Sequence, residues 1–144
     1  MLFCIWLSCK EVARAASFFI GRLNMRRDMD LVRYILLKAG DSNGYIDARD
    51  LLCDKYSDLG QIHYHIKIMT EAGLIESKIV AGWNDEIFES GIISLTWNGN
   101  EFLDVVSNDT VWHRTKSKVL DTVGNASIDV FKSVAINIIS SMVS

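Results

Sequence analysis

The sequence predicts a mainly α-helical domain that carries one small β-hairpin. Proline is absent from the 144 residues, although average usage of about 5% would supply roughly seven, so few segments contain an obligatory helix stop. Apolar residues recur at helical spacing in several segments that begin with a capping side chain. After Gly73 the period changes to short β-branched runs, which are typical of strands.

Three helices are predicted before that change. The first covers residues 25–40, with Asp28 or Asp30 as its cap and Gly40 at its end. A short strand is expected at Tyr45 and Ile46, followed by a second helix over residues 47–57, with inward-facing Leu51, Leu52 and Tyr56. The third helix begins after Ser57 or Asp58, ends at Gly73, and carries on one face Leu59, Ile62, Ile66 and Met69.

A hairpin and three helices follow. Residues 74–83 and 91–97 are the predicted strands, joined by a long tip from Ala81 to Gly91. Helices are then predicted after three caps, namely Thr96, Asn108 or Asp109, and Ser127. This order is that of a winged helix-turn-helix over residues 25–107, with two appended C-terminal helices over residues 108–144.

The first 24 residues differ from the rest. They begin with an apolar run, but Lys10 and Glu11 interrupt it and the positive start of a secretory signal is missing. Met25 opens the first segment with helical periodicity. Two interpretations stay open: an extension from an upstream start codon, or a short helical arm that packs Phe18, Phe19 and Leu23 on the body.

Two motifs carry a resemblance to known proteins. "YHIKIMTEAGLI" resembles the junction between the third helix and the wing in bacterial winged-helix regulators, and "ISLTWNGNEFLD" resembles their strand-to-helix step. With "MRRDMDLVRYILLK" and "DTVWHRTK", these motifs are similar to an uncharacterised family common in phages and prophages, the domain of unknown function 2513 family. The resemblance begins at Met25 and implies a phage-associated winged-helix protein without an established activity.

Composition and motifs exclude several classes of function. The three cysteines form no CxxC pair, which indicates a reducing, cytoplasmic compartment rather than a disulfide framework or a zinc cluster. The apolar runs are shorter than a membrane span. The sequence has no GxSxG motif, no glycine-rich phosphate loop and no Cys–His pair at a family spacing. We therefore expect no membrane insertion, no enzyme activity and no cofactor.

The two histidines of the third helix do not have the spacing of a metal site. Ligands on a helix usually lie at positions i and i+4, whereas His63 and His65 are two apart and point away from each other. His65 lies at the edge of the core face, so we expect it to be semi-buried there and to form hydrogen bonds with its neighbours.

The opposite face of the third helix is the candidate DNA-reading surface. Gln61 and Lys67 are suited to adenine and to guanine or phosphate, with Tyr64 between them. Charge argues against DNA, because residues 25–110 contain eight basic and fifteen acidic residues, a net charge of −7. Further cations that could compensate are Arg26, Arg27, Arg114, Lys116 and Lys118.

The alternative partner is a host or phage protein. Trp83 and Phe88 lie in a predicted wing that contains three carboxylates and no lysine or arginine, and Ile68 adds an apolar side chain on the third helix. The purely structural interpretation is that these aromatic residues fold back and cover the sheet.

The last helix is predicted to join two copies of the chain. Its apolar positions include Ile128, Phe131, Ala135, Ile138 and Met142, and three further aliphatic residues widen the stripe. Packing within one domain would use one stripe, so the surplus favours a homodimer.

Overall fold

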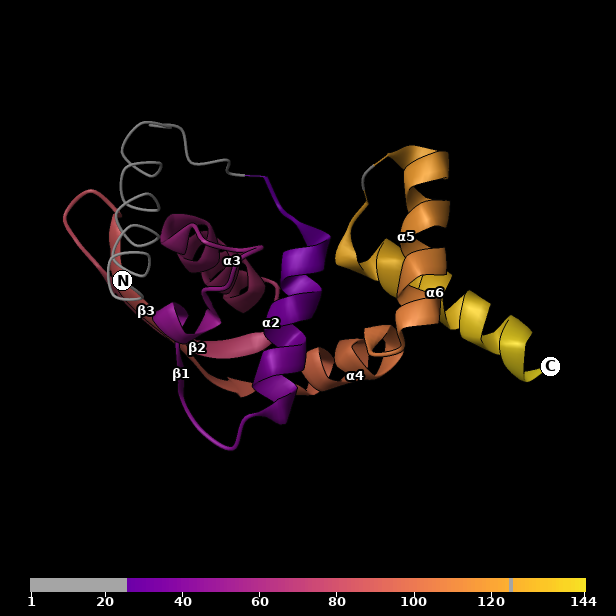
Figure 1. Cartoon of the computed structure of the whole chain (residues 1–144), viewed down its shortest axis with the longest axis horizontal. Helices are drawn as coiled ribbons and strands as arrows, with labels where there is room; N and C mark the ends of the chain where they lie inside the picture. The colour runs from indigo at the N-terminus through magenta and orange to yellow at the C-terminus, as the bar shows by residue number, and fades with distance from the viewer. Residues whose placement is uncertain (1–25, 125) are drawn as a thin grey trace, which may run out of the picture.

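The computed structural model describes residues 26–124 and 126–144 of the chain (Figure 1). The predicted extension at residues 1–24 lies outside the described residues. The described part contains five α-helices, a short 3-10 helix and three strands. In chain order these are α2 (Met29–Asp41), β1 (Ile46–Asp47), η1 (Ala48–Leu51), α3 (Leu59–Glu71), β2 (Ile75–Ala81), β3 (Ile87–Leu95), α4 (Trp97–Val106), α5 (Asp109–Val123) and α6 (Ile128–Val143). The prediction of a mainly helical chain with a small sheet is confirmed.

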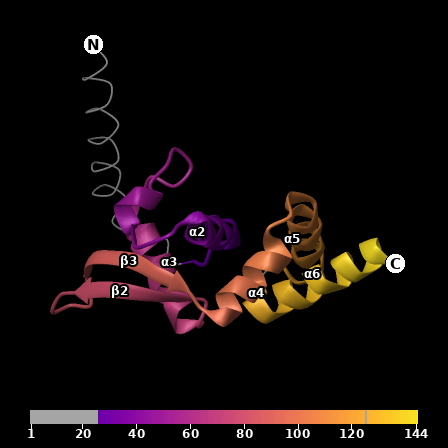
Figure 2. The ribbon, with the colours of Figure 1, turned by 90° about the horizontal axis from the view of Figure 1, so that it is seen from below.

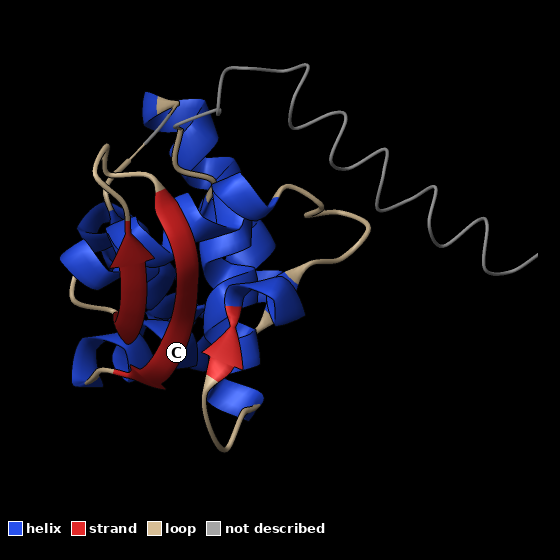
Figure 3. Ribbon diagram, turned by 90° about the vertical axis from the view of Figure 1, so that its left-hand side faces the viewer, coloured by secondary structure: helices blue, strands red, loops and turns tan. Residues whose placement is uncertain are grey.

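The three strands form one antiparallel sheet in the order β1-β3-β2. The β2–β3 register pairs Ile75 with Leu95 and Lys78 with Gly91. The sheet lies on one side of the molecule with helices behind it (Figure 3). Ile75 and Ile92 of the sheet belong to one hydrophobic core with buried side chains of α2, α3 and α4.

Side-chain caps start the helices where the sequence predicts them. Asp28 accepts hydrogen bonds from the backbone N–H groups of Asp30 and Leu31 at 2.9 and 3.3 Å. The other four caps are Asp58, Thr96, Asn108 and Ser127. Each cap satisfies backbone donors that the first helical turn leaves unpaired, so these local signals fix where the helices begin.

The predicted second helix is wrong. Only Ala48–Leu51 is helical, as a single 3-10 turn, and the chain becomes extended at Leu52. Leu51 and Tyr56 are buried, as expected, but Leu52 is exposed. The backbone N–H of Cys53 donates to the carbonyl of Tyr56 at 3.0 Å, so a turn brings Tyr56 inward where a helix was predicted to do so.

Two further details differ from the predictions. Gly40 does not end α2, which continues to Asp41; a Cβ at Gly40 would lie 2.6 Å from Cδ2 of Leu103. Its role is therefore close packing against α4. The hairpin tip is also shorter than predicted, because β3 already begins at Ile87 and leaves only residues 82–86 as the loop.

The C-terminal helices pack at the opposite end of the long axis from the hairpin tip (Figures 1 and 2). Trp112 of α5 is buried and its ring stacks on Phe131 of α6, with centroids 5.7 Å apart. The second half of α6 extends past α5 in both views. Within the described residues, no helix is both long and apolar enough to cross a bilayer.

Candidate nucleic-acid interface

Helix α3 is fixed on two sides by its histidines. His65 is fully buried; its Nε2 accepts a hydrogen bond from the backbone N–H of Asp28 at 2.8 Å, and its Nδ1 lies 2.8 Å from the carbonyl oxygen of Gln61. Nδ1 of His63 lies 2.6 Å from the hydroxyl of Ser90 on β3. The expectation that His65 packs and forms hydrogen bonds is confirmed, but its ring is fully buried where a semi-buried one was expected. These contacts set the rotation of α3, and they point the two rings toward different neighbours.

The outward face of α3 carries the residues predicted to read DNA. Lys67 is exposed, while Gln61, Tyr64 and Ile68 are half-buried. The opposite face buries Ile62, Ile66 and Met69 in the core. The amphipathic arrangement expected from the sequence is therefore present, and it leaves one polar face of α3 accessible.

A pocket beside the start of α3 brings together four of the predicted residues. The pocket measures about 370 Å³ and lies between the starts of α2 and α3 and one side of α5. Its lining includes Arg26, Arg27, Gln61 and Lys116. We call these four residues the entry cluster. Three separate segments of the chain thus contribute cationic or amide side chains to one place.

Asp30 partly neutralises the entry cluster. The Lys116 ammonium lies 2.6 Å from Oδ2 of Asp30, and the Trp112 indole donates to Oδ1 at 2.9 Å. Burial alone would raise the pKa of Asp30, but these two hydrogen bonds outweigh it and the pKa is lowered. The charge of Lys55, which the sequence analysis did not single out, lowers the pKa further. Asp30 is therefore ionised, and together with Asp28, which also lines the pocket, it reduces the net positive charge there.

The remaining predicted cations differ in how available they are. Arg27 donates from Nη2 to the carbonyl of Ala126 at 2.5 Å, so its guanidinium already has a structural role, whereas Arg26 is exposed. Arg114 and Lys118 are exposed on α5, but each lies two residues from Lys116 and therefore on another side of the helix. The basic run on α5 thus divides into one cation that faces α2 and two that face solvent.

The residues of the alternative, protein-binding prediction come from a loop, a strand and a helix. Trp83 is fully exposed in the loop between β2 and β3, and Phe88 is 66% exposed on β3. Ile68 is half-buried on α3. Trp83 does not fold back on the sheet.

No group of three or more metal-ligating side chains occurs among the residues that the structure describes.

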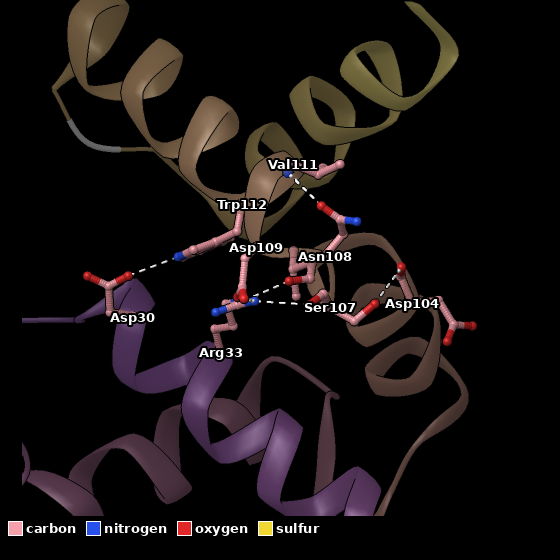
Figure 4. A network of polar contacts seen from close by, with 9 residues as sticks. Asp30, Arg33, Asp104, Ser107, Asn108, Asp109, Val111 and Trp112 are labelled. Atoms are coloured by element: carbon pink, nitrogen blue, oxygen red, sulfur yellow. Dashed lines mark hydrogen bonds and ion pairs between the residues drawn. The ribbon is translucent and has the colours of Figure 1, made fainter. Parts of the chain in front are cut away.

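The sequence analysis missed Arg33, which joins α2 to the corner between α4 and α5 (Figure 4). Its Nε donates to the carbonyl of Val106 at 2.7 Å, and its Nη2 donates to the carbonyl of Ser107 at 3.0 Å. The same Nη2 lies 2.5 Å from a carboxylate oxygen of Asp109. The arginine had counted only toward the net charge of residues 25–110, and these contacts commit it to holding the corner between α4 and α5.

The family described as hypothetical protein (DUF2513) matches residues 26–125, well over half of the chain. The chain belongs to this family. The match confirms the resemblance to the domain of unknown function 2513 family. The matched DUF2513 region contains α2 to α5, and with them the entry cluster and the outward face of α3.

An uncharacterised protein of Haemophilus influenzae is similar to this DUF2513 protein. The two are 38% identical over 121 residues, which cover 82% of this chain and 98% of that protein. No solved structure matches the chain.

Proposed function

We propose that this DUF2513 protein is a phage- or prophage-associated winged helix-turn-helix protein that binds double-stranded DNA in the cytoplasm, as transcriptional regulators do, and acts as a homodimer. In this proposal α3 is the recognition helix and the β2–β3 hairpin is the wing. The observation that carries it is the entry cluster, which gathers Gln61 of α3 with two arginines that precede α2 and one lysine of α5.

The arrangement suits a division between base contacts and phosphate contacts. An α-helix fits the major groove, where the Gln61 amide would pair with adenine and Lys67 with guanine or phosphate. Arg26, beside the start of α3, would contact the phosphates that flank the groove, and Lys116 would do so by exchanging the Asp30 carboxylate for a phosphate. Phosphate contacts position a protein on DNA, and base contacts on α3 would then supply the sequence preference.

The number of available cations limits the affinity for DNA. Arg33 is committed to the contacts at the α4–α5 corner, Arg27 to the Ala126 carbonyl, and Arg49 to an ion pair with Asp47. With about three phosphate contacts per copy, the binding constant would fall with a log–log salt slope of roughly −3. We therefore expect binding that is measurable at about 50 mM salt and weak at physiological salt, unless two copies bind together.

The test is titration of the full chain with random duplex DNA at increasing salt. Lys67→Ala should weaken binding and reduce the slope by about one. Gln61→Ala should leave random-duplex binding unchanged and should reduce the preference among sequences enriched from a random pool. Lys38→Ala, which removes the same charge from the far end of α2, is the matched control. Absence of duplex binding at about 20 mM salt would contradict the proposal.

A second candidate function is supported by the hairpin. Under this alternative the chain is a protein-interaction module that uses the acidic, aromatic wing together with the outward face of α3. Full exposure of Trp83 favours it, because a large apolar side chain at a loop tip gains free energy when a partner buries it. The two candidates separate experimentally, since Lys67 variants address DNA binding and Trp83 variants address protein binding.

A further inference from the structure

The loop at the tip of the β2–β3 hairpin is a closed turn. The backbone N–H of Gly82 donates to the carbonyl of Glu86 at 2.8 Å, and the N–H of Asp85 donates back to the carbonyl of Gly82 at 3.3 Å. Asp85 adopts a positive φ of 58°, which reverses the chain direction. These bonds give Trp83, at the apex, a defined backbone support.

Phe88 is held against the same turn. A Cβ at Gly82 would overlap the edge of the Phe88 ring, so the ring lies directly over the glycine. The ring is nevertheless 66% exposed, and Val80 on the neighbouring strand is also exposed. The tip therefore presents two aromatic side chains on a short, hydrogen-bonded scaffold, and little conformational freedom of its backbone would be lost on binding.

The charge around these aromatic side chains has one sign. Asp85, Glu86 and Glu89 are exposed on the tip. The sequence contains no lysine, arginine or histidine from residue 79 to residue 112. The phosphates of DNA or of anionic lipids would be repelled by these three carboxylates, although Arg49 of η1 offsets part of the charge of Glu89.

From this combination we infer that the hairpin tip docks Trp83 and Phe88 into an apolar pocket on another protein, and that lysine and arginine side chains line the rim of that pocket. Aromatic anchors in a buried centre, with complementary charges at the rim, are the usual distribution of binding energy in protein interfaces. The inference specifies the partner chemistry for the second candidate function above, and it is independent of DNA binding by α3.

The test is a selection of random 16-residue peptides displayed against the immobilised full chain, with counter-selection on the Trp83→Ala variant. Enriched peptides should combine large apolar residues with at least two lysine or arginine residues. Trp83→Ala should weaken binding of a synthetic enriched peptide at least tenfold, and Glu86→Gln about threefold.

Two matched controls accompany the selection. Trp97→Ala removes another exposed tryptophan, 79% exposed on α4, and should leave peptide binding unchanged. Trp83→Ala should leave binding to random duplex DNA unchanged. Loss of peptide binding and loss of DNA binding are therefore separate outcomes, and either candidate function can fail alone.

Several results would overturn the inference. One is enrichment of peptides without a basic bias, and another is equal binding to Trp83→Ala or no enrichment at all. Competition by a synthetic peptide of residues 1–24, which carries a net charge of +2 from Lys10, Arg14, Arg22 and Glu11, would make a segment of the same chain the occupant. Trp83-dependent sedimentation with zwitterionic vesicles would indicate a lipid surface. Trp83-dependent self-association that the Arg114→Glu, Lys118→Glu double variant abolishes would indicate a second copy.

Discussion

His65 stabilises the contact between α2 and α3 only while its ring is neutral. A backbone N–H always donates, so Nε2 must accept from Asp28 and must carry no proton. The ring proton then lies on Nδ1, which donates to the Gln61 carbonyl. Burial lowers the pKa of His65 and outweighs the hydrogen bond to Gln61, which acts in the opposite direction. Both geometry and burial therefore favour the neutral ring.

We expect the free energy of unfolding to decrease as the pH falls below about 6.5. The pKa of His65 is lower in the folded chain than in the unfolded one, where it is about 6.5, so at mildly acidic pH the unfolded chain binds more protons. The contribution is complete above pH 6.5 and is lost as the pH falls through the folded pKa. Urea unfolding at pH 7.5, 6.5 and 5.5 measures it.

The variant His65→Gln separates this contribution from others. It should cost about 1 to 3 kcal/mol at pH 7.5, because buried partners lose their hydrogen bonds, and it should flatten the pH dependence. The pKa of His63 is lowered by burial in the same way, so part of the slope should remain. His113→Gln, at an exposed position of α5, should change neither quantity. A slope that His65→Gln leaves unaltered would contradict the assignment.

Gly99 and Gly40 should respond differently to a methyl group. A Cβ at Gly99 would overlap the backbone carbonyl oxygen of Leu74, whereas at Gly40 it would meet the flexible end of the Leu103 side chain. We expect Gly99→Ala to cost about 1 to 3 kcal/mol, as overpacking against rigid atoms does. Gly40→Ala should cost less, because the higher helix propensity of alanine offsets part of the strain. Equal losses in urea unfolding would refute this reading of the two sites.

At the scale of elements, Arg33 connects the sheet-bearing half of the molecule to α5 and α6. Its side chain is only 14% exposed and donates to two carbonyls that end α4. Its guanidinium carbon also lies 5.7 Å from the ring centroid of Trp112. One half-buried arginine thus replaces hydrogen bonds that the end of α4 would otherwise make with water.

The variant Arg33→Met should destabilise the protein by about 2 to 3 kcal/mol, because two carbonyl groups lose a charged donor. Asp109→Asn is the control for the ion pair alone. Asp109 is 81% exposed, so we expect little change when its charge is removed. Chemical denaturation of both variants distinguishes the contribution of the hydrogen bonds to the α4 carbonyls from that of the ion pair. A larger loss for Asp109→Asn than for Arg33→Met would contradict this assignment.

Elements with a local signal were predictable from the sequence, and those that depend on distant contacts were not. The caps Asp28, Asp58 and Thr96 mark helix starts because each acts on its own first turn. The pattern of residues 47–57 fits both a helix and a 3-10 turn followed by an extended chain, and the Cys53–Tyr56 hydrogen bond belongs to the second. Gly40 was predicted to end its helix because the approach of Leu103 cannot be seen in the sequence.

For the whole molecule, the individual residues of the candidate interface could be predicted from the sequence, but their positions relative to one another could not. The amphipathic period of α3 predicts which of its residues face outward. That Arg26 and Lys116 meet beside Gln61 depends on how α5 packs against α2, which the Trp112–Asp30 hydrogen bond helps to fix. The separation of Arg114 and Lys118 from Lys116 follows from helix geometry alone, once the side of α5 that packs inward is known.

Self-association through α6 is the prediction at this scale, and it bears directly on DNA binding. The second half of α6 runs past α5, and the chain has no charged residue from position 133 to position 144. Ile136 and Val143, seven positions apart and therefore on one side of the helix, are 44% and 83% exposed there. Two copies would cover each other's apolar stripe without repulsion between like charges, as paired amphipathic helices do. A dimer would also double the phosphate contacts, and so offset the small number of cations in each copy.

Analytical ultracentrifugation at micromolar concentration should therefore show species of twice the 16.2 kDa chain mass. The double variant Ile136→Ser, Val143→Ser should shift the equilibrium to the monomer with little effect on unfolding, because neither side chain is buried in one copy. Leu120→Ser, at a 54% exposed position on α5, is the matched apolar control and should leave the dimer intact. If only 16.2 kDa species appear at every concentration, α6 does not pair, and the salt slope of DNA binding should stay near the value for a single copy.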